Sequence, residues 1–156
     1  MDLNIVVRYF KMEDAKPCSL LMQDYFWNHA DNLSIEVRNQ IAENRTTEYI
    51  EQVATDRTIV VATLNTEIVG IGALKGNEIR HMYVESEYQG KGIGTRIMKF
   101  LETEAYEKGL SSVIVNSVDR SEDFYVKNGF HSLIKTQIER HGSILDAILL
   151  EKFLDR

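Results

Sequence analysis

Apolar residues recur along this chain with two different spacings, and each change of spacing marks a boundary between predicted strands and helices. The chain opens with a run rich in Ile and Val, Leu3 to Phe10, which predicts a strand. Helical spacing follows from Asp14 to about His29 and from Ser34 to about Ala54, and Asp14 is suited to cap the first of these helices. The middle of the second, Glu43 to Thr47, is polar, so the helix can break there.

Strands and short connections account for most of the remaining chain. Thr58 to Leu64 and Glu67 to Leu74 are β-branched runs joined by Asn65-Thr66, which predicts a tight hairpin. After a further strand, a glycine-rich segment and a helix, the pattern predicts four more features. These are a strand at Ser112 to Val118, a short helix at Glu122 to Asn128, a left-handed cap at Gly129, and a hairpin of Phe130 to Ile138 and Ile144 to Phe153 that turns at Arg140 to Gly142.

The predicted order of elements is β-α-α-β-β-β-α-β-α-β-β. Three sequential antiparallel strands precede a strand–helix–strand crossover, which joins parallel strands. We therefore expect an α/β (α+β) fold with one mixed sheet of about seven strands and helices on both faces. A chain of 156 residues is expected to form a single domain, residues 1–156.

Composition narrows the class of protein. Hydrophobic residues make up 44% and charged residues 27%, which is typical of a globular domain, and we expect neither a signal peptide nor a membrane-spanning run. The net charge of −6 argues against nucleic acid or an anionic membrane as the main partner and suits a cationic acceptor. The single cysteine, Cys18, fits a reducing cytoplasm, and we expect a buried structural thiol rather than a nucleophile.

The segment with the clearest chemical meaning joins the strand Ile79 to Val84 to the next helix, and it carries glycines at 90, 92 and 94. Glycines at a helix start leave the first N–H groups uncovered at the positive end of the helix dipole, which favours phosphate binding. The P-loop pattern is absent, and Thr95 stands where the dinucleotide fingerprint G-x-G-x-x-G needs its third glycine. The pattern Q-x-x-G-x-G matches Gln89 to Gly94 in full.

With this loop the sequence resembles the GNAT superfamily of acetyl-CoA-dependent N-acetyltransferases, whose pyrophosphate loop carries Q-x-x-G-x-G. The preceding strand fits the family's Leu/Met-x-Val, and Phe124 to Phe130 resembles its F-Y-x-K-x-G-F segment. The resemblance covers essentially the whole chain and implies the GNAT fold, with acetyl-CoA as co-substrate and no metal. It implies cofactor contacts from Asn116, from the strand residues Met82, Tyr83 and Val84, and from the loop residues Gln89, Gly90, Lys91, Gly92, Ile93, Gly94 and Thr95.

Acetyl transfer to an amine needs a base that deprotonates the ammonium, and an acid for the departing thiolate helps. A subset of the family places a catalytic glutamate where Glu78 stands, although a glutamate there can equally pair with Arg80. His81 is the second candidate base because it titrates nearer neutrality. The resemblance gives Tyr125 the role of the acid. Asn116 interrupts an apolar strand, and backbone groups nearby can equally satisfy its amide.

We therefore predict a cytoplasmic N-acetyltransferase that moves an acetyl group from acetyl-CoA to a primary amine of a small molecule or peptide. Direct attack in a ternary complex is favoured, and the resemblance adds a possible homodimer. The family also builds its acceptor pocket from the first two helices and the last hairpin, which makes Tyr25, Phe26, Trp27 and His29 candidates for its wall. Two alternatives stay open: a non-catalytic acyl-CoA-binding or sensing module, and a small dinucleotide-binding oxidoreductase that uses Asp119 for the ribose.

Overall fold

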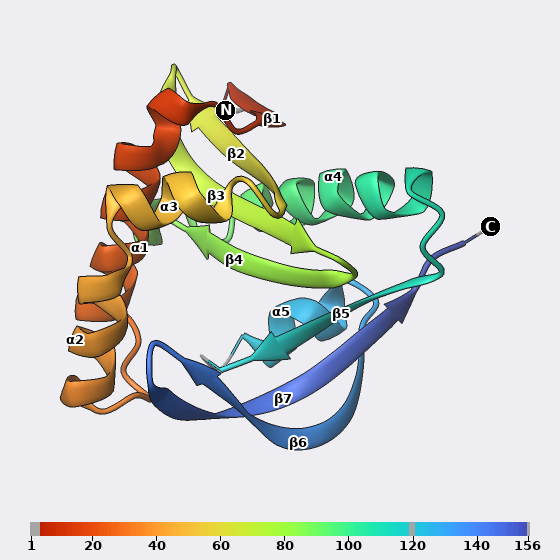
Figure 1. Ribbon diagram of the computed structural model, residues 1–156. Coiled ribbons are helices and arrows are strands. Elements are labelled where there is room, and N and C mark those ends of the chain that lie inside the picture. The colour runs from red at the N-terminus through yellow and green to blue at the C-terminus, as the bar shows by residue number, and fades with distance from the viewer. Residues whose placement is uncertain (1–3, 119–120, 156) are drawn as a thin grey trace.

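The computed structural model describes residues 4–118 and 121–155, and within them the chain forms one seven-stranded sheet (Figure 1). The strand order is β1-β2-β3-β4-β5-β7-β6, and neighbours are antiparallel except β4 and β5, which are parallel. This confirms the expected mixed sheet. The strands are β1 (Ile5–Tyr9), β2 (Thr58–Leu64), β3 (Glu67–Lys75), β4 (Glu78–Val84), β5 (Ser112–Ser117), β6 (His131–Arg140) and β7 (Ser143–Phe153).

Helices cover both faces of the sheet, as expected (Figure 1). Alternate residues of β2 supply two separate cores: Val60 packs with the helix α4 side, and Val61 packs with the side of the first helices. Burial on both faces explains why β2 is a continuous apolar run rather than an alternating one. One face carries α1 (Ala15–Asn28), α2 (Ile35–Asn44) and α3 (Thr47–Val53), and the other carries α4 (Ile93–Glu107) and α5 (Glu122–Lys127). Two 3-10 turns, η1 (Met12–Asp14) and η2 (Ser86–Tyr88), complete the set.

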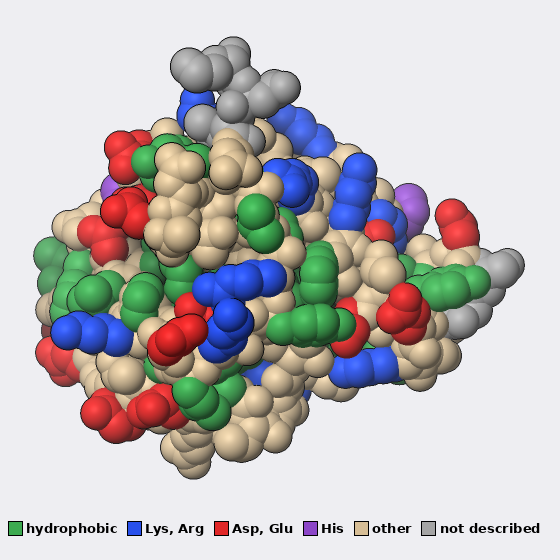
Figure 2. Space-filling view, turned by 90° about the horizontal axis from the view of Figure 1, so that it is seen from above, with side chains coloured by type: hydrophobic (Ala, Val, Ile, Leu, Met, Phe, Trp, Pro, Cys, Tyr) green, Lys and Arg blue, Asp and Glu red, His purple; other side chains and the backbone are tan. Residues whose placement is uncertain are grey.

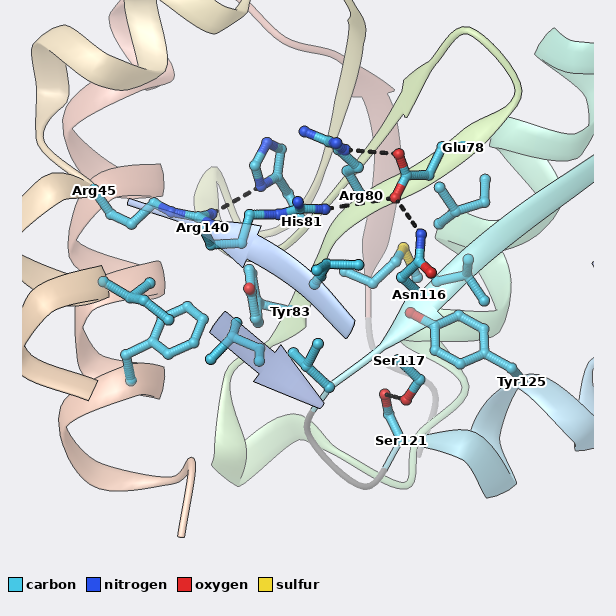
Figure 3. Close-up of a pocket in the computed structure, with 18 residues that line it drawn as sticks. Arg45, Glu78, Arg80, His81, Tyr83, Asn116, Ser117, Ser121, Tyr125 and Arg140 are labelled. Atoms are coloured by element: carbon cyan, nitrogen blue, oxygen red, sulfur yellow. Dashed lines mark hydrogen bonds and ion pairs between the residues drawn. The ribbon is translucent and has the colours of Figure 1, made fainter. Parts of the chain in front are cut away.

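The second predicted helix is two helices, because the chain does break in its polar middle. Helix α2 ends at Asn44, and Arg45 leaves the helical conformation with φ −88° and ψ 54°. Thr46 then caps α3, since its side-chain oxygen accepts a hydrogen bond from the backbone N–H of Tyr49 at 3.1 Å. The break places Arg45 at the corner between two helices, where its side chain points toward the sheet (Figure 3).

The predicted turns are confirmed, with two local differences. Asn65 and Thr66 both have positive φ, as a two-residue hairpin turn requires. The last hairpin turns at His141 and Gly142 alone, so Arg140 is the final residue of β6 rather than part of the turn. Asp14 precedes α1 but makes no side-chain hydrogen bond to it. Its carboxylate accepts from the Lys11 N–H at 2.8 Å and pairs with Arg8 at 2.8 Å instead.

Strand β4 contains a β-bulge that opens the sheet. His81 has a φ of +57°, a left-handed conformation that costs a non-glycine residue about 1–2 kcal/mol. Two residues of β4, His81 and Met82, lie between the paired positions Arg80 and Tyr83, while β3 has only Gly72 there. Strands β4 and β5 pair only through Glu78 and Ile79 at the start of β4, opposite Ile114 and Val115 of β5, and then separate. The separation creates the space in which the candidate site lies.

The molecular surface carries charges of both signs. Figure 2 shows Lys, Arg, Asp and Glu side chains interspersed over the face seen from above. In the described part of the chain, no helix is long and apolar enough to cross a membrane.

Candidate active site

The glycine-rich segment borders a pocket that we call the loop cleft. Its volume is about 680 Å³, and it lies between the end of β4, the start of α4 and α5. Of the predicted loop residues, Lys91 is exposed and does not line the cleft. The others do line it: Gln89, Gly90, Gly92, Ile93, Gly94 and Thr95.

The N-terminus of α4 opens toward the loop cleft. Gly92 is its N-cap residue, and no side chain caps this end of the helix. Gly92 has a φ of +81°, where glycine is the unstrained choice. Gly94 is required for a different reason, because a Cβ atom there would lie 2.9 Å from the Phe124 ring. The first-turn N–H groups of α4 have no acceptor within their own helix, so they are available to an anion.

The end of β4 forms one wall of the loop cleft. Because β4 and β5 pair only near Glu78 and Ile79, no strand among the described residues pairs with Met82 to Val84 on the β5 side. The Gln89 side chain donates to the Val84 carbonyl at 3.1 Å, which ties the loop to the strand. This edge can accept an extended ligand as an added strand would pair.

The second pocket, which we call the arginine pocket, has a volume of about 70 Å³ and lies on the other side of the gap between β4 and β5 (Figure 3). Four charged side chains line it: Arg45, Glu78, Arg80 and Arg140. The loop cleft and the arginine pocket share part of their lining, namely Met82, Tyr83, Ser121 and Tyr125. Ligands in the two pockets would therefore adjoin at the gap in the sheet.

Tyr125 lies where the two pockets meet. It is 4% exposed, and its ring packs edge-on against Phe124 and Phe130, with centroids 5.1 and 5.5 Å away. Figure 3 shows its hydroxyl directed into the gap, on the side of Asn116. The aromatic packing fixes the ring while the hydroxyl faces both pockets.

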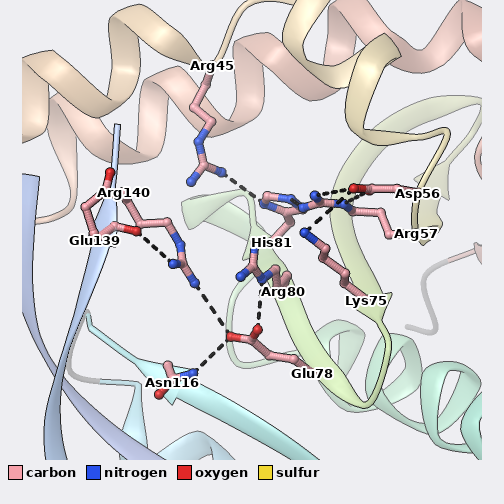
Figure 4. Close-up of polar contacts among 10 residues, drawn as sticks. All are labelled: Arg45, Asp56, Arg57, Lys75, Glu78, Arg80, His81, Asn116, Glu139 and Arg140. Atoms are coloured by element: carbon pink, nitrogen blue, oxygen red, sulfur yellow. Dashed lines mark hydrogen bonds and ion pairs between the residues drawn. The ribbon is translucent and has the colours of Figure 1, made fainter. Parts of the chain in front are cut away.

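Glu78 is held in the arginine pocket by two hydrogen-bond donors and one further ion pair (Figure 4). Arg80 Nε donates to one carboxylate oxygen at 3.1 Å. The other oxygen accepts from Asn116 Nδ2 at 3.0 Å and lies 3.6 Å from Arg140 Nη2. The predicted pairing of Glu78 with Arg80 is therefore present. Asn116 lines this pocket, and its amide is satisfied by a side chain rather than by backbone; its contact with a cofactor stays a prediction.

His81 lies between two arginines. Arg45 Nη1 is 2.9 Å from its Nδ1 atom, and Arg57 Nη1 is 3.0 Å from its Nε2 atom. Guanidinium groups only donate, and a neutral imidazole has one acceptor nitrogen, so His81 can accept from one arginine alone. Burial, together with the charges of Arg45 and Arg57, holds the pKa of His81 well below its ordinary value. These contacts favour Glu78 over His81 as the base.

The remaining candidates are distributed between core and surface. Phe26 lines the arginine pocket, Tyr25 and His29 line the loop cleft, and Trp27 is 46% exposed. Cys18 is fully buried, as predicted, and burial raises the pKa of its thiol to about 12. Asp119, the proposed ribose ligand of the oxidoreductase alternative, lies outside the described residues. Within the described ranges, no group of three or more His, Cys, Asp or Glu residues could hold a metal ion.

Fold and site together define an α/β protein whose sheet opens between its parallel strands, with two adjoining pockets at the opening, one of them at the N-terminus of α4. Residues 28–146 match the family model of the acetyltransferase (GNAT) domain, so the chain belongs to this family. The resemblance stated from sequence, the fold class and the expectation of an acyltransferase are thereby confirmed. No curated protein matches the chain.

Solved structures share this fold over nearly the full length of both chains. The GCN5-related N-acetyltransferase from Rhodopseudomonas palustris has a TM-score of 0.90 at 23% identity and covers 99% of each chain. PaiA N-acetyltransferase from Thermoplasma acidophilum, in complex with coenzyme A, has a TM-score of 0.77 at 21% identity over 97% of this chain and 99% of its own. A putative acetyltransferase from Salmonella typhimurium with acetyl-CoA has a TM-score of 0.69 at 17% identity over 98% and 95%.

Proposed function

We propose that this protein is an acetyl-CoA-dependent N-acetyltransferase that acts on a primary amine of a small molecule or peptide by direct attack in a ternary complex. The observation that carries the proposal is the junction of the loop cleft and the arginine pocket at Tyr125. Direct attack needs the thioester and the amine side by side. The buried, protonated Cys18 gives no support to a covalent acyl-enzyme.

Acetyl-CoA fits the loop cleft on two grounds. The N–H groups at the start of α4 would donate to its pyrophosphate, and the free edge of β4, Met82 to Val84, would pair with its pantetheine arm. The structures from Thermoplasma acidophilum and Salmonella typhimurium contain coenzyme A and acetyl-CoA, respectively, which supports the same ligand here. When bound, this co-substrate supplies the thioester carbonyl.

Glu78 is the proposed base, and it acts through water. Its carboxylate is held by Arg80, Arg140 and Asn116 at the wall of the arginine pocket. A volume of about 70 Å³ has room for about five waters at ~15 Å³ each. The proton of the ammonium passes through such a water to Glu78, and the freed nitrogen bonds to the carbonyl carbon.

Tyr125 is the proposed acid for the leaving group. As the C–S bond breaks, negative charge collects on sulfur, and the Tyr125 hydroxyl would give its proton to the thiolate. The nitrogen loses its second proton as the amide forms, and this proton restores the hydroxyl. Its position at the junction of the pockets, with the ring fixed by Phe124 and Phe130, supports this role. A homodimer and a cytoplasmic location stay predictions.

The test has two stages. Acetyl-CoA at 100 times its Kd should stabilise the fold by about 2.7 kcal/mol and raise the melting temperature by roughly 5–11 °C, while NAD should not. A panel of primary amines is then assayed for coenzyme A released from acetyl-CoA. Stabilisation by acetyl-CoA without release by any amine would indicate the sensing module instead, and stabilisation by NAD alone would refute the proposal altogether.

A further inference from the structure

The arginine pocket is positively charged, although the chain as a whole has a net charge of −6. Its lining contains three guanidinium groups, from Arg45, Arg80 and Arg140, and one carboxylate, from Glu78, which gives a net charge of +2. Elsewhere charges of both signs are interspersed over the face in Figure 2. The charge of this pocket is thus opposite in sign to that of the whole chain.

Arg45 is the most informative of these residues. It is 4% exposed, and no carboxylate among the described residues pairs with it. Arg57, the other arginine beside His81, has Asp56 at 2.7 Å (Figure 4). Burying a charge without an opposite charge is costly. The uncompensated guanidinium of Arg45 therefore indicates that the pocket's ligand supplies the negative charge.

The neighbours of Arg45 orient it without neutralising it. Its Nε donates to His141 Nε2 at 3.1 Å, its Nη1 contacts His81 Nδ1 at 2.9 Å, and its guanidinium stacks over the rings of Phe26 and Tyr49 at 5.7 and 5.3 Å. Burial and the charge of Arg45 lower the pKa of both histidines, so they stay neutral acceptors. Within the described chain, Nη2 of Arg45 has no hydrogen-bond partner.

Arg80 and Arg140 keep donor groups that do not contact Glu78. Arg80 reaches it through Nε, and among described residues the two Nη groups of Arg80 have no partner. Arg140 is 3.6 Å from Glu78, and burial together with the charge of Arg80 lowers the pKa of Arg140. The positive potential that disfavours the charged form of Arg140 also favours the binding of an anion in the pocket.

We infer that the acceptor is a small primary amine that also carries an oxyanion group, a carboxylate or a phosphate, and that Arg45 and Arg140 bind this group. The inference rests on the proposed function and gives it a substrate class. Guanidinium groups bind either oxyanion through charge-assisted hydrogen bonds. Since the pocket holds only about 70 Å³, it suits a small molecule rather than a folded protein segment. The acidic chain composition, which suits a cationic acceptor, is a poorer guide than the local charge.

Matched amines provide the test. Glycine and β-alanine are compared with glycinamide and β-alaninamide, O-phosphoethanolamine with ethanolamine, and putrescine serves as the dication. Coenzyme A release should give a kcat/KM about 10–100-fold higher for the anionic member of a pair, as expected for a charge-assisted hydrogen bond. The two acidic series separate carboxylate from phosphate. Equal or better rates with neutral amines or putrescine would overturn the inference and leave the acetyltransferase intact.

Variants of the chain test whether Arg140 causes the preference for anionic amines. Arg140→Gln should raise the ratio of KM for the anionic amine to KM for its neutral partner by about 10-fold or more, because the changed surroundings of Glu78 affect both amines alike, and Arg140→Lys should recover part of the difference. Lys135→Gln removes one charge from the exposed opposite face of the same strand and should change neither value. Equal effects of Arg140→Gln and Lys135→Gln would contradict binding at Arg140.

A binding measurement keeps the inference testable without turnover. If no amine releases coenzyme A, the proposed function fails, and calorimetry on the enzyme–coenzyme A complex decides the inference separately. Glycine or O-phosphoethanolamine should bind that complex more tightly than glycinamide or ethanolamine, and Arg45→Lys and Arg140→Gln should weaken the binding. Absence of any such preference would overturn the assignment of Arg45 and Arg140.

Discussion

The sharpest prediction about chemistry concerns Tyr125→Phe, which deletes one hydroxyl and keeps the ring. Because the ring packs against Phe124 and Phe130 and is 4% exposed, the substitution leaves this packing intact. At most one buried hydrogen bond is lost with the hydroxyl, which would cost about 0.5–1.5 kcal/mol. At roughly 2–4 °C per kcal/mol for a chain of this length, the melting temperature should fall by only a few degrees.

Turnover should change far more than stability. General-acid assistance is worth about 10²–10⁴-fold, and a thiolate is a good leaving group, so we expect a loss of kcat near 100-fold. An interaction made only as charge collects on sulfur lowers kcat and kcat/KM together, with acetyl-CoA binding nearly unchanged.

The assay pairs kcat from coenzyme A release with the melting temperature. Tyr106→Phe on α4 serves as the control, because it makes the same chemical change outside both pockets and is expected to keep wild-type kcat. A Tyr125→Phe enzyme with unchanged kcat would remove Tyr125 from the mechanism.

Three further predictions address the loop, the base and the bulge. Gly92→Val should abolish the rise in melting temperature that acetyl-CoA causes. Gly76→Val should keep that rise, because Gly76 also has positive φ and open space around it but lies outside the cleft. A rise retained in Gly92→Val would contradict the phosphate site. Glu78→Gln should slow transfer most at low pH, where the acceptor amine is most protonated, and wild-type rates at every pH would move the base elsewhere. The pKa of His81 is lower in the folded protein than in the unfolded chain. Below pH 6.5 His81 therefore binds a proton in the unfolded chain but not in the folded protein, and the free energy of unfolding falls as the pH falls, by up to about 1.4 kcal/mol per pH unit. His81→Asn, which tolerates the positive φ, should flatten that decline in denaturant titrations at pH 7, 6 and 5, and equal slopes would refute it.

The loop side of the site could be predicted from sequence because its parts are contiguous. Gln89 to Gly94 is a local pattern that follows a strand and opens a helix, so strand, loop and helix can be placed together without tertiary information. The inclusion of Tyr125 among the candidate site residues could be predicted for a similar reason, because it rests on the local segment Phe124 to Phe130. The β2–β3 turn at Asn65 and Thr66 likewise depends only on neighbouring residues.

The arginine pocket could not be predicted, because its side chains come from distant elements. Arg45 lies in the helix break, and the polar segment Glu43 to Thr47 was the only local signal for it. Arg140 faces the pocket because the β6–β7 register makes it the last strand residue. The bulge also matters: strict alternation would put Arg80 and His81 on opposite faces, yet both line the same pocket.

The burial of Cys18 has a practical consequence for all of these measurements. Coenzyme A release is conveniently followed with a thiol-reactive dye, and a protein's own exposed thiols would add background to that signal. Cys18 is the single cysteine of the chain, it is fully buried on the inner side of α1, and its thiol is protonated at assay pH. The folded enzyme should therefore not react with the dye. When the chain unfolds, one equivalent of thiol per molecule appears, so the same reagent that counts turnover also counts unfolded protein in every variant.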